Sequence, residues 1–147
     1  MNTSTIAPHT ETTVLQFLET AYALERKLDR ALSMTKGISF SEYRLLKVLS
    51  QANSGGFPRI DLANGVGLTA SAVTRALKPL EKIGLVSTER SVRDARQSLA
   101  MLTPAGLALL DDAQAILQDA LRELPINTLS PQKITDFQTV LNDLRIK

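Results

Sequence analysis

Residues 61–86 have the sequence DLANGVGLTASAVTRALKPLEKIGLV. Its first part predicts a short helix over residues 60–66, because Gly67 suits the left-handed conformation that follows a helix end. Thr69 can cap a longer helix, whose apolar spacing continues until Gly84 stops it. The stretch therefore predicts two helices joined by a tight turn, which is the helix-turn-helix arrangement.

The longer helix combines an apolar row with a polar and basic row. The apolar row recurs at helical spacing and is expected to face the core; its members are Val73, Ala76, Leu77, Leu80 and Ile83. The outward row consists of Ser71, Thr74, Arg75 and Lys78. The second helix of such a motif enters the major groove of DNA, where arginine can pair with guanine and hydroxyls can bond any base. These four residues are candidate DNA contacts, and a plain solvated helix face is the competing interpretation.

A charged hairpin is predicted directly after this helix. Residues 85–90 and 97–103 are rich in strand-forming side chains, and residues 91–96 between them have the sequence SVRDAR. We expect a β-wing whose tip presents Arg93 and Arg96 to an adjacent minor groove. The predicted fold is mainly α (α+β), a winged helix-turn-helix domain with a two-stranded β-wing.

Helices are also predicted on both sides of this unit. Residues 10–32 carry an apolar stripe broader than one core-facing surface needs, so a second subunit is the expected partner. Ser39 and Glu42 form a capping box that starts the next helix, which ends at a turn over residues 53–56. Two further helices start with a capping residue and a proline, at Thr103-Pro104 and Ser130-Pro131.

The composition bounds the class of protein. A chain of 147 residues fits a single domain over residues 1–147, and a hydrophobic fraction of 44% is ample for one core. Cysteine is absent, which excludes disulfides, cysteine-based zinc sites and thiol redox sensing. No apolar run approaches the length of a membrane span, so we expect no membrane partner and a cytoplasmic location.

Basic residues concentrate in the middle of the chain. The formal net charge is +2, yet residues 59–103 hold seven basic residues against four acidic ones. A basic middle between near-neutral flanks suits a protein that presents one face to a polyanion. Arg59 therefore joins the candidate DNA contacts, while an ordinary solvated surface remains the alternative.

The helix-turn-helix stretch and the wing together resemble the MarR family of bacterial and archaeal regulators. The resemblance rests on residues 61–75 and 80–86, and on a wing with the D-x-R pattern of Asp94-Ala-Arg96. Residues 102–106 add the family's L-T-x-x-G pattern, and residues 38–46 (ISFSEYRLL) resemble the entry to its second helix. The flanking helices agree with the family in placement.

This resemblance implies a homodimeric regulator that binds a palindromic operator in double-stranded DNA and acts as a repressor. The family's dimerisation helices correspond to residues 10–35 and 106–147, and its DNA-binding part corresponds to residues 38–103. Ligands of the family lodge between these two parts. A small-molecule effector is therefore a candidate partner, with candidate contacts at Tyr22, Tyr43 and Arg44. The alternative is that both tyrosines simply pack with their hydroxyls at the surface.

The resemblance also implies roles for individual DNA-binding residues. Arg75 falls on the recognition helix, and Arg96 matches the wing arginine that enters the minor groove. Asp94 matches the acid that orients basic groups nearby. Two departures concern the docking angle: Pro79 lies inside the recognition helix, where it is expected to kink or loosen a turn, and the helix before it begins at Pro58-Arg59 without a capping side chain.

Two other classes of function compete with a DNA-binding regulator. An enzyme is not expected, because the chain has one histidine, His9, no cysteine and no glycine-rich phosphate loop. Asp111 and Asp112 are neighbours on a helix and point about 100° apart, so paired acid-base work and metal binding are disfavoured. We therefore expect no catalytic residues, metal site or cofactor. A winged helix that binds protein is the second alternative, although such modules usually lack a basic helix face and wing.

Overall fold

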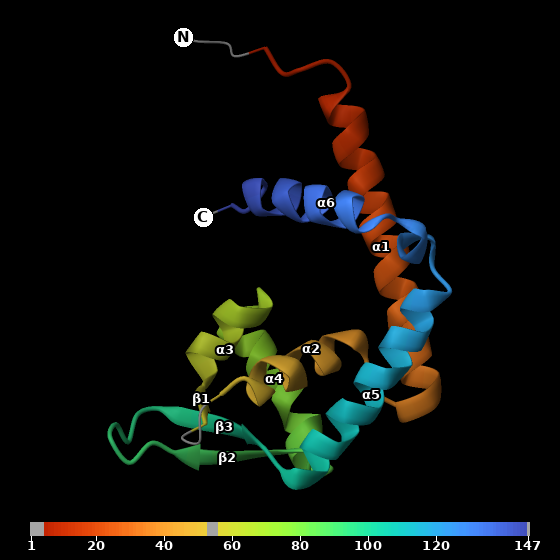
Figure 1. Ribbon diagram of the computed structural model, residues 1–147. Helices are drawn as coiled ribbons and strands as arrows, with labels where there is room; N and C mark the ends of the chain where they lie inside the picture. The colour runs from red at the N-terminus through yellow and green to blue at the C-terminus, as the bar shows by residue number, and fades with distance from the viewer. Residues whose placement is uncertain (1–4, 53–55, 147) are drawn as a thin grey trace.

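The computed structural model describes residues 5–52 and 56–146, so the turn predicted over residues 53–56 lies outside it except for Gly56. Its elements in chain order are α1 (Thr10–Lys36), α2 (Phe40–Ser50), β1 (Phe57–Pro58), α3 (Arg59–Val66), α4 (Ala70–Lys82), β2 (Val86–Arg90), β3 (Ser98–Leu102), α5 (Pro104–Arg122), the 3₁₀ helix η1 (Pro125–Thr128) and α6 (Pro131–Asp143) (Figure 1). The predicted order of helices and hairpin is confirmed. Strand β1 and η1 are additions that the sequence did not predict.

The four predicted caps start the helices as expected. In each case a hydroxyl oxygen accepts a hydrogen bond from the backbone N–H three residues on: Ser39 from Glu42, Thr69 from Ala72, Thr103 from Gly106, and Ser130 from Lys133. Gly67 and Gly84 lie in the left-handed region, with φ of 68° and 80°, and end α3 and α4. Helix α3 follows Pro58 without a side-chain cap among the described residues, also as predicted.

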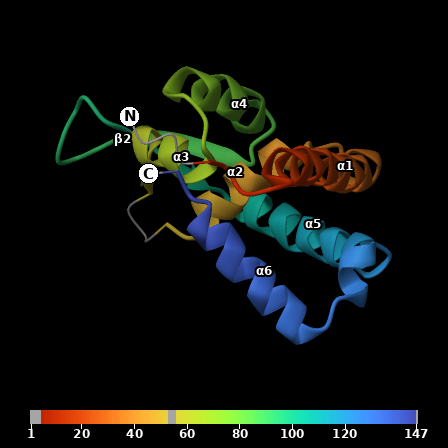
Figure 2. The ribbon, with the colours of Figure 1, turned by 90° about the horizontal axis from the view of Figure 1, so that it is seen from above.

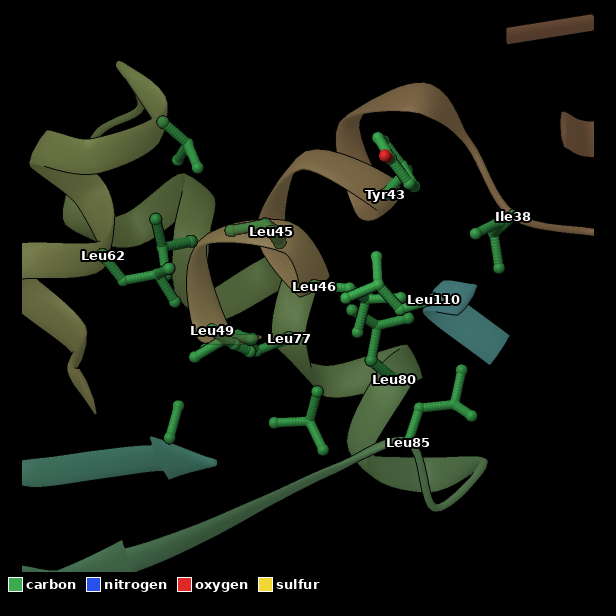
Figure 3. Close-up of a cluster of buried hydrophobic side chains, with 14 of the residues drawn as sticks. Ile38, Tyr43, Leu45, Leu46, Leu49, Leu62, Leu77, Leu80, Leu85 and Leu110 are labelled. Carbon is green, nitrogen blue, oxygen red and sulfur yellow. The ribbon is translucent and has the colours of Figure 1, made fainter. Parts of the chain in front are cut away.

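The core lies where α2, α4 and α5 meet the sheet (Figure 3). Val73, Leu77 and Leu80 of α4 are fully buried there, as the apolar row predicted. Ile83 was predicted to face inward and is instead 63% exposed. Ile83 lies ten positions after Val73, so its side chain points about 80° away from that of Val73 around the helix axis. It is also the C-cap residue, at which the chain leaves the helix.

The sheet has three antiparallel strands in the order β1-β3-β2. Strands β2 and β3 form the predicted hairpin, in register from Val86 opposite Leu102 to Arg90 opposite Ser98. The expected two-stranded wing thus gains a short third strand, because Phe57 and Pro58 pair with Ala100 and Leu99. This pairing attaches the start of α3 to the wing.

The helices outside the winged unit have very different surroundings. Helix α1 lies alongside α5, whereas α6 extends away from both in the two views (Figures 1 and 2). Helix α6, all of which is described, has no buried residue.

Helix α4 continues through Pro79 to Lys82, so the proline does not end it. None of the helices in residues 5–52 and 56–146 is long and apolar enough to cross a membrane.

Candidate DNA-binding surface

The outward row of α4 forms one continuous polar face. Ser71, Arg75 and Lys78 are exposed, and Thr74 is half-buried. The Thr74 hydroxyl donates to the backbone oxygen of Ala70 at 3.1 Å, which fixes its side chain against the helix. Ala70, Ser71, Thr74 and Arg75 together line a shallow hollow in the surface. The four residues predicted from helical spacing therefore share a face.

The wing projects from the body of the molecule, and its tip is held by local hydrogen bonds (Figure 1). The Ser91 hydroxyl accepts from the N–H groups of Arg93 and Asp94 at 3.2 and 3.3 Å. Across the tip, the Gln97 N–H donates to the Asp94 backbone oxygen, and the Ser91 N–H donates to the Gln97 oxygen. These bonds order the backbone of the tip while the side chains of Arg93 and Arg96 stay exposed.

Asp94 acts on this loop through the backbone. Its carboxylate accepts a hydrogen bond from the Arg96 N–H at 3.0 Å. The resemblance predicted an acid that orients neighbouring basic groups. The structure supplies a means for that role, since a side chain that fixes the backbone two residues on also fixes where the next side chain starts.

Arg59 has a different environment from the other candidate contacts. Its guanidinium donates to Glu81 of α4 at 3.0 Å and to the hydroxyl of Thr88 in β2 at 3.1 Å. Its side chain is 26% exposed, whereas Arg75, Arg93 and Arg96 are exposed. Arg59 is therefore half-buried and paired within the protein, whereas the other three arginines are exposed.

Two exposed residues of the wing were not among the predicted contacts. Arg90 ends β2 with its side chain in solvent, and Val92 in the tip is fully exposed. The concentration of basic residues already included Arg90, so that signal could have found it. Nothing in the sequence pattern marks Val92 as a contact, because its side chain carries no charge and no hydrogen-bonding group.

The three residues predicted for an effector lie in three environments. Tyr22 is 65% exposed, with the Arg26 guanidinium 5.7 Å from its ring centre, and it lines an open polar hollow with Glu25, Asp29 and other residues of α1. Tyr43 packs in the core against Phe40, and burial raises the pKa of its hydroxyl. Arg44 is exposed on α2. The effector site therefore stays a prediction.

Comparisons with known proteins agree with this geometry. Residues 38–98 match the profile described as the MarR family. A helix-turn-helix-type transcriptional repressor of Mycobacterium tuberculosis is 32% identical over 108 residues, which cover 74% of this chain and 76% of the relative.

Solved structures extend the likeness over almost the whole chain. A MarR family regulator from Streptomyces coelicolor, solved in complex with DNA, superposes with a TM-score of 0.87 at 26% identity and covers 95% of this chain and 88% of that one. Another Streptomyces coelicolor regulator of the family, AbsC, gives a TM-score of 0.85 at 22% identity, with 97% and 95% covered, and supports the fold. Profile, relative and fold agree: the chain belongs to the MarR family, whose members are transcription regulators and not enzymes.

Proposed function

We propose that this regulator binds a palindromic operator in double-stranded DNA as a homodimer and represses transcription. Helix α4 would enter the major groove, and the wing would reach the adjacent minor groove. The observation that carries this proposal is the exposed row of Ser71, Arg75 and Lys78 on α4, in the same subunit as a wing tip that exposes Arg93 and Arg96. The regulator from Streptomyces coelicolor that was solved with DNA supports it by likeness.

The proposed contacts fall into classes according to the part of the DNA that each can bind. Ser71, Thr74 and Arg75 carry donors and acceptors suited to base edges. Lys78 and Arg93 are exposed cations suited to phosphates, which position a protein without reading sequence. Arg96 is assigned to the minor groove, with Asp94 holding its backbone.

The homodimer is proposed from apolar surface that the subunit leaves uncovered. The first half of α1 and all of α6 expose large apolar side chains, among them Val14, Leu15, Leu18, Phe137, Val140 and Leu144. Large apolar side chains left in water on two helices are a liability for a soluble monomer, and a short helix without packing is marginal in water. We assign residues 10–35 and 106–147 to dimerisation and residues 38–103 to DNA binding. A twofold dimer presents two α4 helices, which is why the operator is proposed to be palindromic.

The proposal also includes repression of transcription, a cytoplasmic location of the protein and a small-molecule effector. The relative from Mycobacterium tuberculosis is named a repressor, and a protein that acts on the chromosome is placed in the cytoplasm. Release by a small molecule would involve Tyr22, because its hollow along α1 is open to solvent, whereas Tyr43 lies in the core.

The proposal is tested by recovering and sequencing the fragments that the purified protein retains from its own genome. One fragment is then titrated at several salt concentrations. We expect sequence-selective retardation whose affinity falls by about 10³-fold between about 50 and 200 mM salt, as six phosphate contacts would give. A protein that enriches no fragment, or whose retention does not depend on salt, would instead fit a winged helix that binds protein.

A further inference from the structure

Arg59 joins three elements of the winged unit at one point. It is the first residue of α3, directly after Pro58, which pairs with Leu99 of the sheet. Its guanidinium donates to Glu81 near the end of α4 and to Thr88 in the middle of β2, at 3.0 and 3.1 Å. Glu81 also accepts a hydrogen bond from the Thr88 hydroxyl. The Arg59–Glu81–Thr88 cluster thus links the recognition helix to the base of the wing.

This cluster is withdrawn from solvent. The side chains of Arg59 and Glu81 are 26% and 29% exposed, and the Nε of Arg59 is buried without a hydrogen-bond partner among the described residues. A partly buried, charge-assisted pair is screened less and held more rigidly than a pair on the surface. An ion pair in this place can therefore fix the relative orientation of two elements.

We infer that Arg59 is a positioning residue, which with Glu81 sets the angle between the recognition helix and the wing. The inference rests on the proposed DNA binding. The wing tip at Arg93 is five residues beyond Thr88, or roughly 16 Å along a strand. A tilt of about 10° at the base would move the tip by roughly 3 Å, and functional contacts tolerate shifts of about 0.5 Å. The orientation at the base therefore decides whether Arg96 reaches its groove.

The competing assignment is the one that charge alone predicted, in which Arg59 binds a DNA phosphate. The two assignments predict opposite changes in DNA affinity for the same substitution. If Arg59 binds phosphate, removing Glu81 frees a guanidinium and deletes a nearby negative charge, so affinity rises. If the pair positions the wing, the same change loosens the wing and affinity falls.

The test compares Glu81→Ala with Glu89→Ala, which removes an exposed carboxylate from strand β2 of the wing. Binding is measured on a fragment selected by the wild-type protein, with hydroxyl-radical footprinting of the minor groove and methylation protection of guanines in the major groove. We expect Glu81→Ala to weaken binding about fivefold to tenfold and to lose the protection under the wing, while the guanines stay protected. Glu89→Ala keeps the full footprint.

Two further variants separate positioning from a loss of folding. Glu81→Gln can still accept from Arg59 and is expected to bind within about twofold of wild type. Thr88→Val keeps the size of the side chain, removes the hydroxyl, and is expected to lose part of the wing protection even if Glu81→Ala does not fold. The positioning role is overturned if Glu81→Ala binds DNA as tightly as wild type with a complete footprint. It is also overturned if Thr88→Val and Glu81→Gln give the same affinity and the same protection under the wing. Absence of any wild-type footprint would instead overturn the proposed DNA binding.

Discussion

Arg75 and Arg96 are both exposed, but one projects from a helix and the other from a hairpin tip. Arg75 lies in the middle of α4, whose buried face is anchored by Val73 and Leu77. Arg96 lies in a hairpin tip held by local hydrogen bonds, including the one from its own N–H to Asp94. A contact from the rigid helix can discriminate bases, whereas a contact from the tip is suited to the width and potential of a minor groove.

This difference predicts distinct effects of removing each arginine. Arg75→Ala should cost about 1–3 kcal/mol of binding per half-site and relax preference at one or two base pairs. Arg96→Ala should weaken binding to many sequences and change mainly the preference for flanking A·T pairs. Both variants should unfold within about 0.5 kcal/mol of wild type, because neither side chain is buried. Selection of sites from a randomised DNA pool checks the two patterns.

A control for this pair is Arg122→Ala, which removes an exposed arginine at the end of α5, away from the wing (Figure 1). That variant should select the same sites as wild type. Full operator affinity in the Arg75→Ala, Arg96→Ala double variant would contradict the docking arrangement.

Gly106 is fixed by a close approach of two backbones. A Cβ at this position would lie 2.1 Å from the backbone oxygen of Leu85, so the start of α5 and the base of the wing would have to separate. Gly106→Ala should therefore destabilise the fold by about 1–3 kcal/mol, as overpacking does. Denaturant unfolding measures this. Gly65→Ala is the matched control, because among the described residues its Cβ meets only Val48, and alanine favours the helix more than glycine does. A similar loss of stability in both variants would argue against the Gly106 contact.

At the scale of elements, the sequence predicts what depends on neighbouring residues. Ser39 and Thr69 cap their helices because the hydroxyl and the N–H that it accepts from are three residues apart. The outward row of α4 was predicted for the same reason, since helical spacing alone brings its members to one face.

Features that depend on distant residues were not visible in the sequence. Strand β1 contains only Phe57 and Pro58, too short for a period of two, and it forms because β3 supplies partners. The DNA contact of Arg59 stays a prediction; what the sequence did not reveal is that Glu81 and Thr88, 22 and 29 residues away along the chain, are its partners. The sequence reveals that a side chain is basic, whereas only the fold reveals which residue it pairs with.

The recognition helix contains a proline whose cost can be measured. Pro79 has no N–H for the carbonyl of Arg75, four residues before it, and α4 still continues to Lys82. A proline inside a helix lowers the free energy of unfolding by about 3 kcal/mol, and its restriction of the unfolded chain raises it by up to about 1 kcal/mol. Pro79→Ala should therefore stabilise the protein by about 2 kcal/mol. Thermal unfolding checks this, with Pro104→Ala as control, because a proline in the first turn of α5 should cost nothing. Lower stability of Pro79→Ala would mean that the ring is needed in its packing.

At the scale of the whole molecule, the contacts within one chain cover the apolar side chains of some helices and not of others. The winged unit has a continuous core, whereas the first half of α1 and the whole of α6 extend away from it (Figures 1 and 2). Most of the large apolar side chains of these two segments are exposed. Both segments belong to the regions assigned to dimerisation. In the proposed dimer, DNA binding would depend on them, because two linked recognition helices bind two half-sites with a higher effective concentration than either alone.

Substitution of Phe137 tests this dependence directly. In the isolated subunit its side chain is 40% exposed, so Phe137→Asp should be tolerated if the protein is a monomer. In the proposed dimer the same change buries an unpaired carboxylate, so the dimer should dissociate and operator affinity should fall by more than about tenfold. Thr139→Asp is the matched control, since two positions along α6 turn it by about 200° to the opposite face. Sedimentation equilibrium and DNA retardation measure both variants. A Phe137→Asp protein that sediments as a dimer and binds its operator with full affinity would show that α6 does not form the interface.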